Sequence, residues 1–353
     1  MTFVLGRESG PDDGPVGRLG SYRARDGSAG APLSLDLDGP HAVSVVGKRG
    51  YGKSYTLGVL AEALARTRGV APVVVDPMGA FDGLADRADA GATPVPARVV
   101  RRPAVTPASL DPRSWCALLG LAPESGAGGL VWQAATNADT LPAMREHVAG
   151  TDAPQADRRA AASHLSLAAS WGAFDADGLS ARSLATAEAT VLDVSGLDAA
   201  PMNAVVRGVA ESLYRARVDG NVARLPWLLV DEAHTLFEGV ARPALDRLLT
   251  RGRAPGVSLV LATQRPGAVP DVGISQSDLL VSHRLTARAD LDALERARPT
   301  YMDTSLADRM PTDPGDVVVV DDATETVHAA RVRGRDTPHG GDSPRVSDRL
   351  PEQ

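Results

Sequence analysis

The sequence is short of cysteine, aromatic residues and long apolar runs, and each shortage excludes a class of protein. The single cysteine, Cys116, excludes an internal disulfide and a metal site built from several thiolates. No apolar run approaches the ~18–20 residues of a membrane span, and the N-terminus lacks a signal-peptide pattern. We therefore expect a cytoplasmic protein with no membrane partner. Aromatic residues make up only 4% of the chain, so its core must be built mainly from Ala, Val and Leu.

Lysine is almost absent, although the chain is well charged. Only Lys48 and Lys53 are lysines among the 37 basic residues, and the 44 acidic residues comprise 33 Asp and 11 Glu, which gives a formal net charge of −7. This balance excludes a strongly basic nucleic-acid coat and a polybasic membrane binder. GC-rich coding explains Arg in place of Lys, whereas the acidic excess is typical of a salt-accumulating halophile. In molar salt the Debye length is about 3 Å, so surface ion pairs would contribute little.

Strand and helix patterns alternate along most of the chain. Residues 1–38 are rich in Gly, Asp, Ser and Pro, and we expect a short extension there with one or two edge strands. Residues 39–335 should form the core, with strands at 42–46, 73–75, 190–194, 227–230, 257–262, 279–281 and 317–320, and helices at 53–68, 202–217 and 241–251. This alternation predicts an α/β fold with a mostly parallel sheet flanked by helices.

Three further segments differ from the rest of the chain in composition or pattern. Residues 107–187 are rich in Ala and Leu and have few β-branched runs, which predicts a helical insert forming a lid or a small subdomain. Residues 317–332 carry two strand patterns around a polar turn and are expected to form a terminal hairpin. Residues 336–353 are rich in Gly, Pro, Asp and Ser, which favours a disordered tail.

A phosphate-binding loop follows the first strand of the core. The segment GKRGYGKS, residues 47–54, fits G-x-x-x-x-G-K-[ST] at every fixed position, between a buried strand and a helical pattern. Glycines let backbone N–H groups point at phosphate oxygens, and the helix N-terminus adds partial positive charge. Lys53 should reach the β- and γ-phosphates, and Ser54 should ligate Mg²⁺. We expect ATP to bind at Gly47, Lys48, Arg49, Gly50, Tyr51, Gly52, Lys53, Ser54 and Tyr55.

A second strand ends in two acids. The run Leu228–Val230 is followed by Asp231 and Glu232, whose side chains point to opposite sides if the strand continues. We expect Asp231 to hold Mg²⁺ and Glu232 to orient or deprotonate the attacking water. This acidic pair favours an ATPase over a GTPase. No guanine-reading N-K-x-D sequence is present, since both lysines lie in the phosphate loop.

Polar residues at the ends of the next helix and strand complete the expected site. Gln264 follows a buried strand, where it could sense the γ-phosphate or the water, although a simple strand-exit turn gives the same pattern. Arg253, or less favourably Arg251, could insert into the nucleotide of a neighbouring subunit, but a cation at a helix C-terminus is also ordinary. The histidines have no metal spacing, and we expect His234 to be a structural hydrogen-bonding residue.

These motifs together resemble the HerA-type branch of the HerA/FtsK ATPases. The resemblance covers about residues 41–335 and is carried by the sequences GKRGYGKSYTLGVLAE, LPWLLVDEAH, LLTRGRAPGVSLVLATQRP and ISQSDLLVSHRLT. It implies a RecA-like P-loop core, a homo-oligomeric ring that is usually hexameric, and ATP-driven movement along double-stranded DNA. It also implies that Gln264 is the sensor and that Arg253 is the arginine acting across the subunit interface.

The N-terminus departs from the family. Larger HerA proteins carry a β-barrel there, and 38 residues are too few for one, which weakens the expectation of a NurA-type nuclease partner. We therefore expect a shortened HerA-like ATPase that uses ATP and Mg²⁺, hydrolyses ATP and acts as a DNA translocase or helicase in DNA processing or repair. The alternatives are a nucleotide-gated scaffold that binds ATP without translocating DNA, and a motor for protein or pilus transport.

Overall fold

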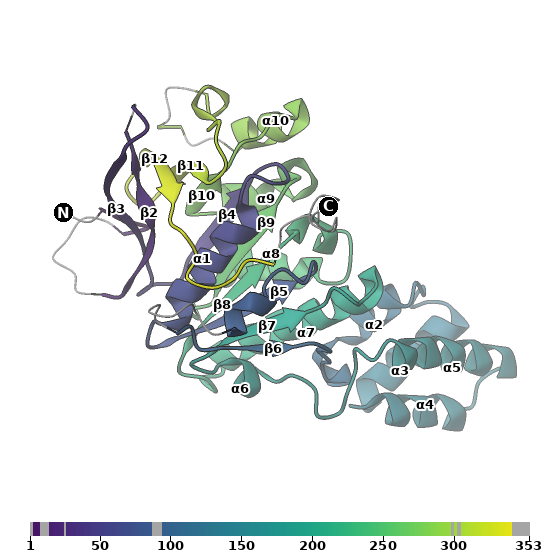
Figure 1. Cartoon of the computed structure of the whole chain (residues 1–353). Coiled ribbons are helices and arrows are strands. Elements are labelled where there is room, and N and C mark those ends of the chain that lie inside the picture. Colours follow the sequence, from purple (N-terminus) through teal and green to yellow (C-terminus); the bar gives the residue numbers. More distant parts are fainter. Residues whose placement is uncertain are drawn as a thin grey trace, which may run out of the picture.

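The computed structural model describes residues 3–7, 14–24, 26–86, 94–297, 300–301 and 305–340. These residues form a single twelve-stranded sheet with helices on both faces (Figure 1). The strands are β1 (Phe3–Leu5), β2 (Val16–Arg23), β3 (Ala29–Asp36), β4 (Ala42–Val46), β5 (Val70–Asp76), β6 (Ala97–Val100), β7 (Ala189–Asp193), β8 (Leu225–Val230), β9 (Ser258–Thr263), β10 (Leu279–Ser282), β11 (Asp316–Asp321) and β12 (Thr326–Val332).

Ten α-helices and five short 3₁₀ turns connect these strands within the described ranges. The helices are α1 (Lys53–Ala65), α2 (Pro112–Leu118), α3 (Gly126–Asn137), α4 (Leu141–Gly150), α5 (Gln155–Ser170), α6 (Ala181–Leu184), α7 (Ala199–Val218), α8 (Arg242–Arg251), α9 (Asp271–Ser275) and α10 (Arg288–Arg296). The turns are η1 (Asp82–Ala85), η2 (Pro107–Ser109), η3 (Ala233–Leu236), η4 (Pro266–Ala268) and η5 (Ala307–Arg309). None of the described helices is long and apolar enough to cross a membrane.

The strand order explains why the polar strand ends meet. Seven strands run parallel in the order β6-β7-β5-β8-β9-β4-β10, and the order continues with β11, β12, β2, β3 and β1. In this second group, β11 pairs antiparallel with β10, β12 with β11, β2 with β12, and β3 with β2. Strand β1 pairs parallel with β3. The last residues of β4 and β9 pair with each other, as do Val75 of β5 and Val230 of β8. The carboxyl ends of these four strands therefore share one edge of the sheet.

Alternation along the central strands divides the interior into two cores. Val73 and Val75 of β5 face a core formed with α7, α8 and the insert helices, whereas Val74 faces a core formed with α1 and the N-terminal strands. Strand β8 behaves in the same way, with Leu228 on the first side and Leu229 on the second. A strand that is buried on both faces has a continuous run of apolar residues, so the sequence pattern predicts these strands clearly.

The predicted α/β class is confirmed, with a mostly parallel sheet between helices. Helices α2 to α6 lie within the segment predicted as a helical insert, and α2 to α5 form a lobe beside the sheet (Figure 1). Strands β11 and β12 form the predicted hairpin. The sequence did not predict strand β6, and residues 1–38 contribute three strands to the main sheet instead of a loose extension.

The segment predicted as a disordered tail begins against helix α1. The backbone N–H groups of Asp336 and Thr337 both donate to Oε1 of Glu62 at 3.0 Å, and Arg333 Nη1 lies 2.8 Å from Oε2 of the same residue. Glu62 is fully buried on α1. This carboxylate fastens residues 333–340, which we call the C-terminal strap. Residues 341–353 of the predicted tail lie outside the described residues.

Candidate active site

The phosphate loop curls between the end of β4 and the start of α1. Gly50 and Gly52 have φ of 81° and 108°, in the left-handed region that favours glycine. Gly47 is required for a different reason, because a Cβ atom there would lie 2.5 Å from Cβ of His283. The loop thus takes a shape that other residues would strain, and it turns backbone N–H groups inward.

Lys53 begins α1 and lies under this loop. Its side chain is 5% exposed, and Nζ donates to the carbonyl oxygen of Lys48 at 3.4 Å. Burial lowers the pKa of Lys53, while the nearby carboxylates of Glu232 and Asp231 act in the opposite direction. The ammonium group is therefore desolvated and directed at the acidic end of β8, as a phosphate-binding cation should be.

Ser54 and Asp231 join the loop to the acidic strand. Ser54 Oγ donates to Asp231 Oδ2 at 2.7 Å, across 177 residues of sequence. Asp231 is fully buried, and burial raises the pKa of its carboxyl group. A hydroxyl and a carboxylate in contact are the hard oxygen ligands that Mg²⁺ takes, so the pair fits the predicted metal. Bound there, the ion would neutralise charge on phosphate oxygens.

Asp76, at the end of β5, is a buried acid beside Asp231. Its carboxylate accepts hydrogen bonds from the backbone N–H groups of Met78, Ala80 and Phe81 at 2.9–3.1 Å. Burial raises the pKa of Asp76, and the charge of Asp231 adds to this effect. Asp76 therefore holds the turn that places Met78 and Ala80 on the cavity wall.

Glu232 adopts a backbone conformation that is unusual outside glycine. Its φ and ψ are 45° and 43°, in the left-handed region, and its N–H donates to Asp231 Oδ1 at 2.9 Å. This turn ends β8 and directs the Glu232 side chain to the cavity, of which it forms part of the wall. Strain of this kind is tolerated where the surrounding structure requires one side-chain direction.

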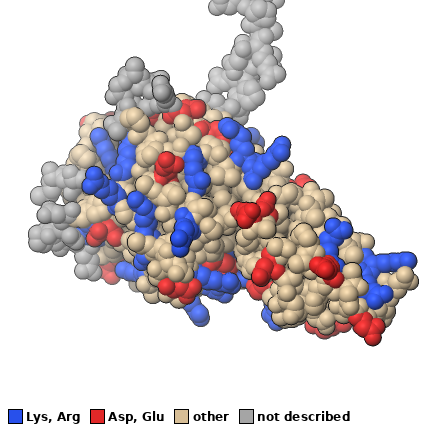
Figure 2. Space-filling view, turned by 90° about the horizontal axis from the view of Figure 1, so that it is seen from below, with Lys and Arg blue, Asp and Glu red and all other residues tan. Residues whose placement is uncertain are grey.

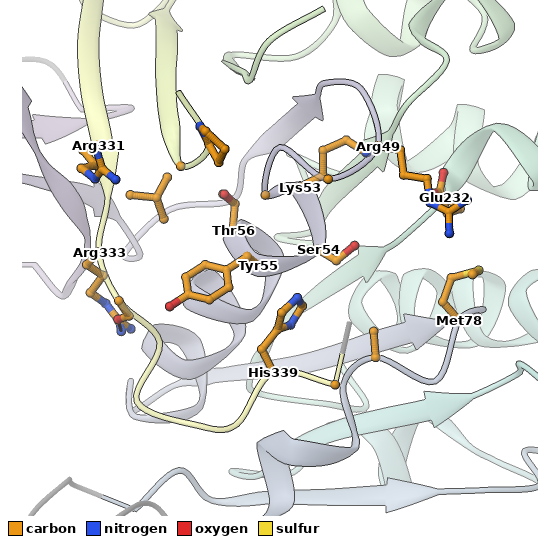
Figure 3. A pocket seen from close by; sticks show the side chains of 18 residues that line it. Arg49, Lys53, Ser54, Tyr55, Thr56, Met78, Glu232, Arg331, Arg333 and His339 are labelled. Carbon is orange, nitrogen blue, oxygen red and sulfur yellow. Dashed lines mark hydrogen bonds between the residues drawn. The ribbon is translucent and has the colours of Figure 1, made fainter. Parts of the chain in front are cut away.

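A cavity of about 780 Å³ is lined by Lys53, Ser54 and Glu232, among others. Figure 3 shows Lys53 and Ser54 between two walls, with Glu232 and Met78 on one side and Arg331 and Arg333 on the other. The rest of the wall is given by Arg49, Gly50, Gly52, Tyr55, Thr56, Ala80, Pro314, Gly315, Val332, Gly334, His339 and Gly340. The cavity is therefore longer than the phosphate loop and reaches the C-terminal strap.

Three residues predicted for the site lie apart from this cavity. Gln264 follows the last residue of β9 and is half-buried at the same sheet edge, but it does not line the cavity. Arg251 and Arg253 are exposed and precede β9, at the opposite edge. Because β9 spans six residues, or roughly 20 Å, neither arginine reaches the cavity of its own chain.

Sequence reasoning missed His283, which supports the loop from below. Its Nε2 atom lies 2.9 Å from Thr56 Oγ1, its ring faces Gly52, and its Cβ atom and backbone face Gly47. Burial, and then the charge of Lys53, lower the pKa of His283 to about 3, so the imidazole is neutral. No local pattern marks this histidine, because its partners lie more than 200 residues away. The strap residues Arg333 and His339 were missed for the same reason.

Comparison with known proteins finds a family match for part of the chain. Residues 16–158 match the family model described as "Helicase HerA, central domain". This part of the chain is similar to the central domain of HerA helicases. The matched range contains the phosphate loop and α1, whereas β8 and β9 follow later in the chain.

Solved structures show which fold the chain has. VirB4 of Thermoanaerobacter pseudethanolicus is 17% identical, with a TM-score of 0.67 over 92% of this chain and 98% of that one. The plasmid coupling protein TrwB, in complex with ADP and Mg²⁺, is 14% identical, with a TM-score of 0.57 over 85% and 86%. These similarities confirm the predicted RecA-like P-loop fold. A search of curated proteins finds no match to the sequence.

Proposed function

We propose that this chain binds ATP with Mg²⁺, hydrolyses it, and works as a ring-shaped motor on double-stranded DNA. One observation carries the ATPase proposal. Lys53, Ser54 and Glu232 line a single cavity, and Ser54 is hydrogen-bonded to Asp231 behind it, although the loop and the acidic pair are about 180 residues apart in sequence. Few reactions other than phosphoanhydride hydrolysis need a desolvated cation, a magnesium ligand pair and a free carboxylate in one place.

Each wall of the cavity has a separate task in this proposal. The triphosphate lies on the phosphate loop, where Lys53 balances its charge, and the nucleoside extends past Tyr55 toward Arg331, Arg333 and the C-terminal strap. Ser54 and Asp231 hold the metal. Glu232 orients a water molecule for attack on the γ-phosphorus atom and accepts its proton. The complex of TrwB with ADP and Mg²⁺ supports this choice of ligands.

The proposal of a DNA motor rests on the match to the central domain of a helicase. The negative net charge does not oppose it, since a local basic surface is sufficient. Figure 2 shows Lys and Arg side chains over the main body of the molecule on the face it presents, and fewer over the lobe of the helical insert. Phosphate contacts weaken in salt, so closure of a ring around DNA could substitute for affinity.

A nucleotide-gated scaffold is the second candidate, and the overall acidity of the chain favours it. Turnover of ATP with and without duplex DNA, across salt concentrations, separates the two. A motor hydrolyses ATP and does so faster on DNA, whereas a scaffold binds ATP and turns over slowly whether DNA is present or not. Glu232→Gln protein is the matched control for contaminating ATPases. An active enzyme that never responds to duplex DNA would overturn the DNA proposal and leave the ATPase proposal standing.

A further inference from the structure

One nitrogen atom of His234 lies between two functional elements. Its Nδ1 atom is 3.2 Å from the hydroxyl oxygen of Thr263, the last residue of β9, and 3.4 Å from Oε2 of Glu232. His234 lies on η3, directly after the acidic end of β8, and is half-buried. A ring nitrogen that carries a proton donates a hydrogen bond, and one without a proton accepts a hydrogen bond. Nδ1 therefore cannot form the same kind of hydrogen bond with both neighbours at once.

The carboxylate of Glu232 depends on this histidine. Its Oε2 atom is buried, and among the described residues no hydrogen-bond partner satisfies it. A buried carboxylate oxygen without a donor is costly, and His234 Nδ1, 3.4 Å away, is a nitrogen that can donate to it when it carries a proton.

Thr263 connects the same nitrogen to the exit of β9. Besides its contact with His234, Thr263 Oγ1 accepts a hydrogen bond from the backbone N–H of Arg265 at 3.0 Å. This bond spans Gln264 and shapes the turn that carries it. A shift of that turn therefore moves the Thr263 hydroxyl, and with it the partner of His234.

The surroundings of His234 favour its neutral form, in which the ring carries one proton. Burial lowers the pKa of His234, the cations Arg265 and Lys53 lower it further, and the carboxylates of Glu238 and Asp231 oppose them. A neutral ring has two tautomers. With the proton on Nδ1, the ring donates to Glu232 Oε2 or to Thr263. With the proton on Nε2, Nδ1 accepts from the Thr263 hydroxyl and Glu232 is released.

We propose that His234 is a positioning residue that couples the direction of the Glu232 carboxylate to the exit of β9 through Thr263. The inference rests on the proposed ATPase function and adds a regulator to its site. A change of nucleotide state that displaces the Thr263 turn would exchange the partner of Nδ1 and so turn the Glu232 carboxylate toward the attacking water or away from it.

Steady-state ATP hydrolysis by the full chain tests this coupling. We expect His234→Ala to lower kcat about tenfold with KM for ATP within a factor of about two, because misplacing a reacting group slows the chemical step and leaves ground-state binding intact. His234→Asn, whose amide nitrogen can occupy the place of Nδ1, should recover most of kcat. His164→Ala, on α5 of the insert, is the matched control and should behave as wild type.

A double-mutant cycle supplies the second readout. Thr263→Val should also lower kcat, Thr263→Ser should not, and the loss in the pair His234→Ala with Thr263→Val should be smaller than the product of the single losses. Native kcat in His234→Ala, or losses that multiply, would overturn the coupling. If His234→Ala does not fold, the Thr263 pair decides in its place. If wild type and the His164→Ala control do not hydrolyse ATP, the proposed function itself fails.

Discussion

Lys53 is buried beside two carboxylates, and this position sets its expected contribution. Burial lowers the pKa of Lys53 and the neighbouring acids oppose that effect, which favours the ammonium form that pairs with phosphate. We expect Lys53→Ala to weaken ATP binding by about 10–100-fold, which corresponds to the roughly 1.5–3 kcal/mol of a hydrogen bond to a charged group. Titration with a fluorescent ATP analogue measures this. His164→Ala, on α5 of the insert, is the control and should leave the affinity unchanged.

Glu232→Gln should separate binding from chemistry. The amide has nearly the shape of the carboxylate but cannot accept a proton from water, so ATP affinity should stay within a factor of about three while kcat falls by about 100-fold or more. Binding and turnover measured on the same preparation give both numbers. A variant that hydrolyses ATP at the native rate would contradict the role proposed for this residue.

The predictable part of the site is the part with fixed spacing. Lys53 and Ser54 could be predicted because a phosphate-binding loop needs these residue types at set positions. Asp231 and Glu232 could be predicted because they directly follow an apolar strand. The partnership of His234 with Thr263 is not readable, although each lies next to a motif, since it depends on the adjacency of β8 and β9. Sequence order reveals the motifs and not which strands become neighbours.

Among the elements, the N-terminal strands are attached to the parallel sheet by a buried charged group. His41, just before β4, places Nε2 3.2 Å from Asp36 at the end of β3 and Nδ1 2.6 Å from Asp278 before β10. Arg7 completes the cluster by pairing with Asp36. Burial disfavours the charged imidazole, but the hydrogen bonds to Asp278 and Asp36 prevail and raise the pKa of His41 to about 9.

This raised pKa predicts a loss of stability in mild alkali. A group whose pKa is higher in the folded state contributes fully below its unfolded value of about 6.5, and the contribution disappears as the pH rises through about 9. The free energy of unfolding in urea should therefore fall, by on the order of 3 kcal/mol, between pH 6.5 and 9.5. His41→Gln should remove most of that pH dependence, whereas His164→Gln should leave it in place. Equal slopes in the two variants would contradict the assignment.

Strands differed in how well the sequence predicted them, and burial explains the difference. Strands β4 and β5 are buried along nearly their whole length and appear as continuous apolar runs. Strand β6 lies at a sheet edge and all four of its residues are only half-buried, so its pattern is weak. Strand β2 contains two glycines and pairs with β12, more than 300 residues away. Such pairings are tertiary and have no local signature.

At the scale of the whole molecule, the position of Arg253 makes a second subunit necessary if it acts in catalysis. It is exposed at the sheet edge opposite to the cavity of its own chain. We expect Arg253→Ala to bind ATP normally and to lose most turnover, because an arginine supplied across an interface stabilises charge in the transition state. Turnover should depend on oligomerisation, which light scattering with and without nucleotide measures.

Mixed oligomers test whether Arg253 acts across an interface. Arg253→Ala and Glu232→Gln proteins should each be nearly inactive alone, and mixing them should restore part of the activity, because some interfaces then combine an intact Glu232 with an intact Arg253. Arg251→Ala is the matched control and should need no complementation. A mixture that stays inactive, although light scattering shows mixed assemblies, would exclude action between subunits.

The helical lobe leaves the sheet after β6 and re-enters at β7, two strands that are parallel neighbours at the far margin. Such a pair always needs a crossover of a dozen or more residues, usually helical, so the whole lobe occupies the place of an ordinary connecting helix. The strand ends that carry the phosphate loop and Glu232 belong to β4 and β8, further along the sheet. A different insert between β6 and β7 would therefore change the surface of the molecule and leave the nucleotide site unchanged.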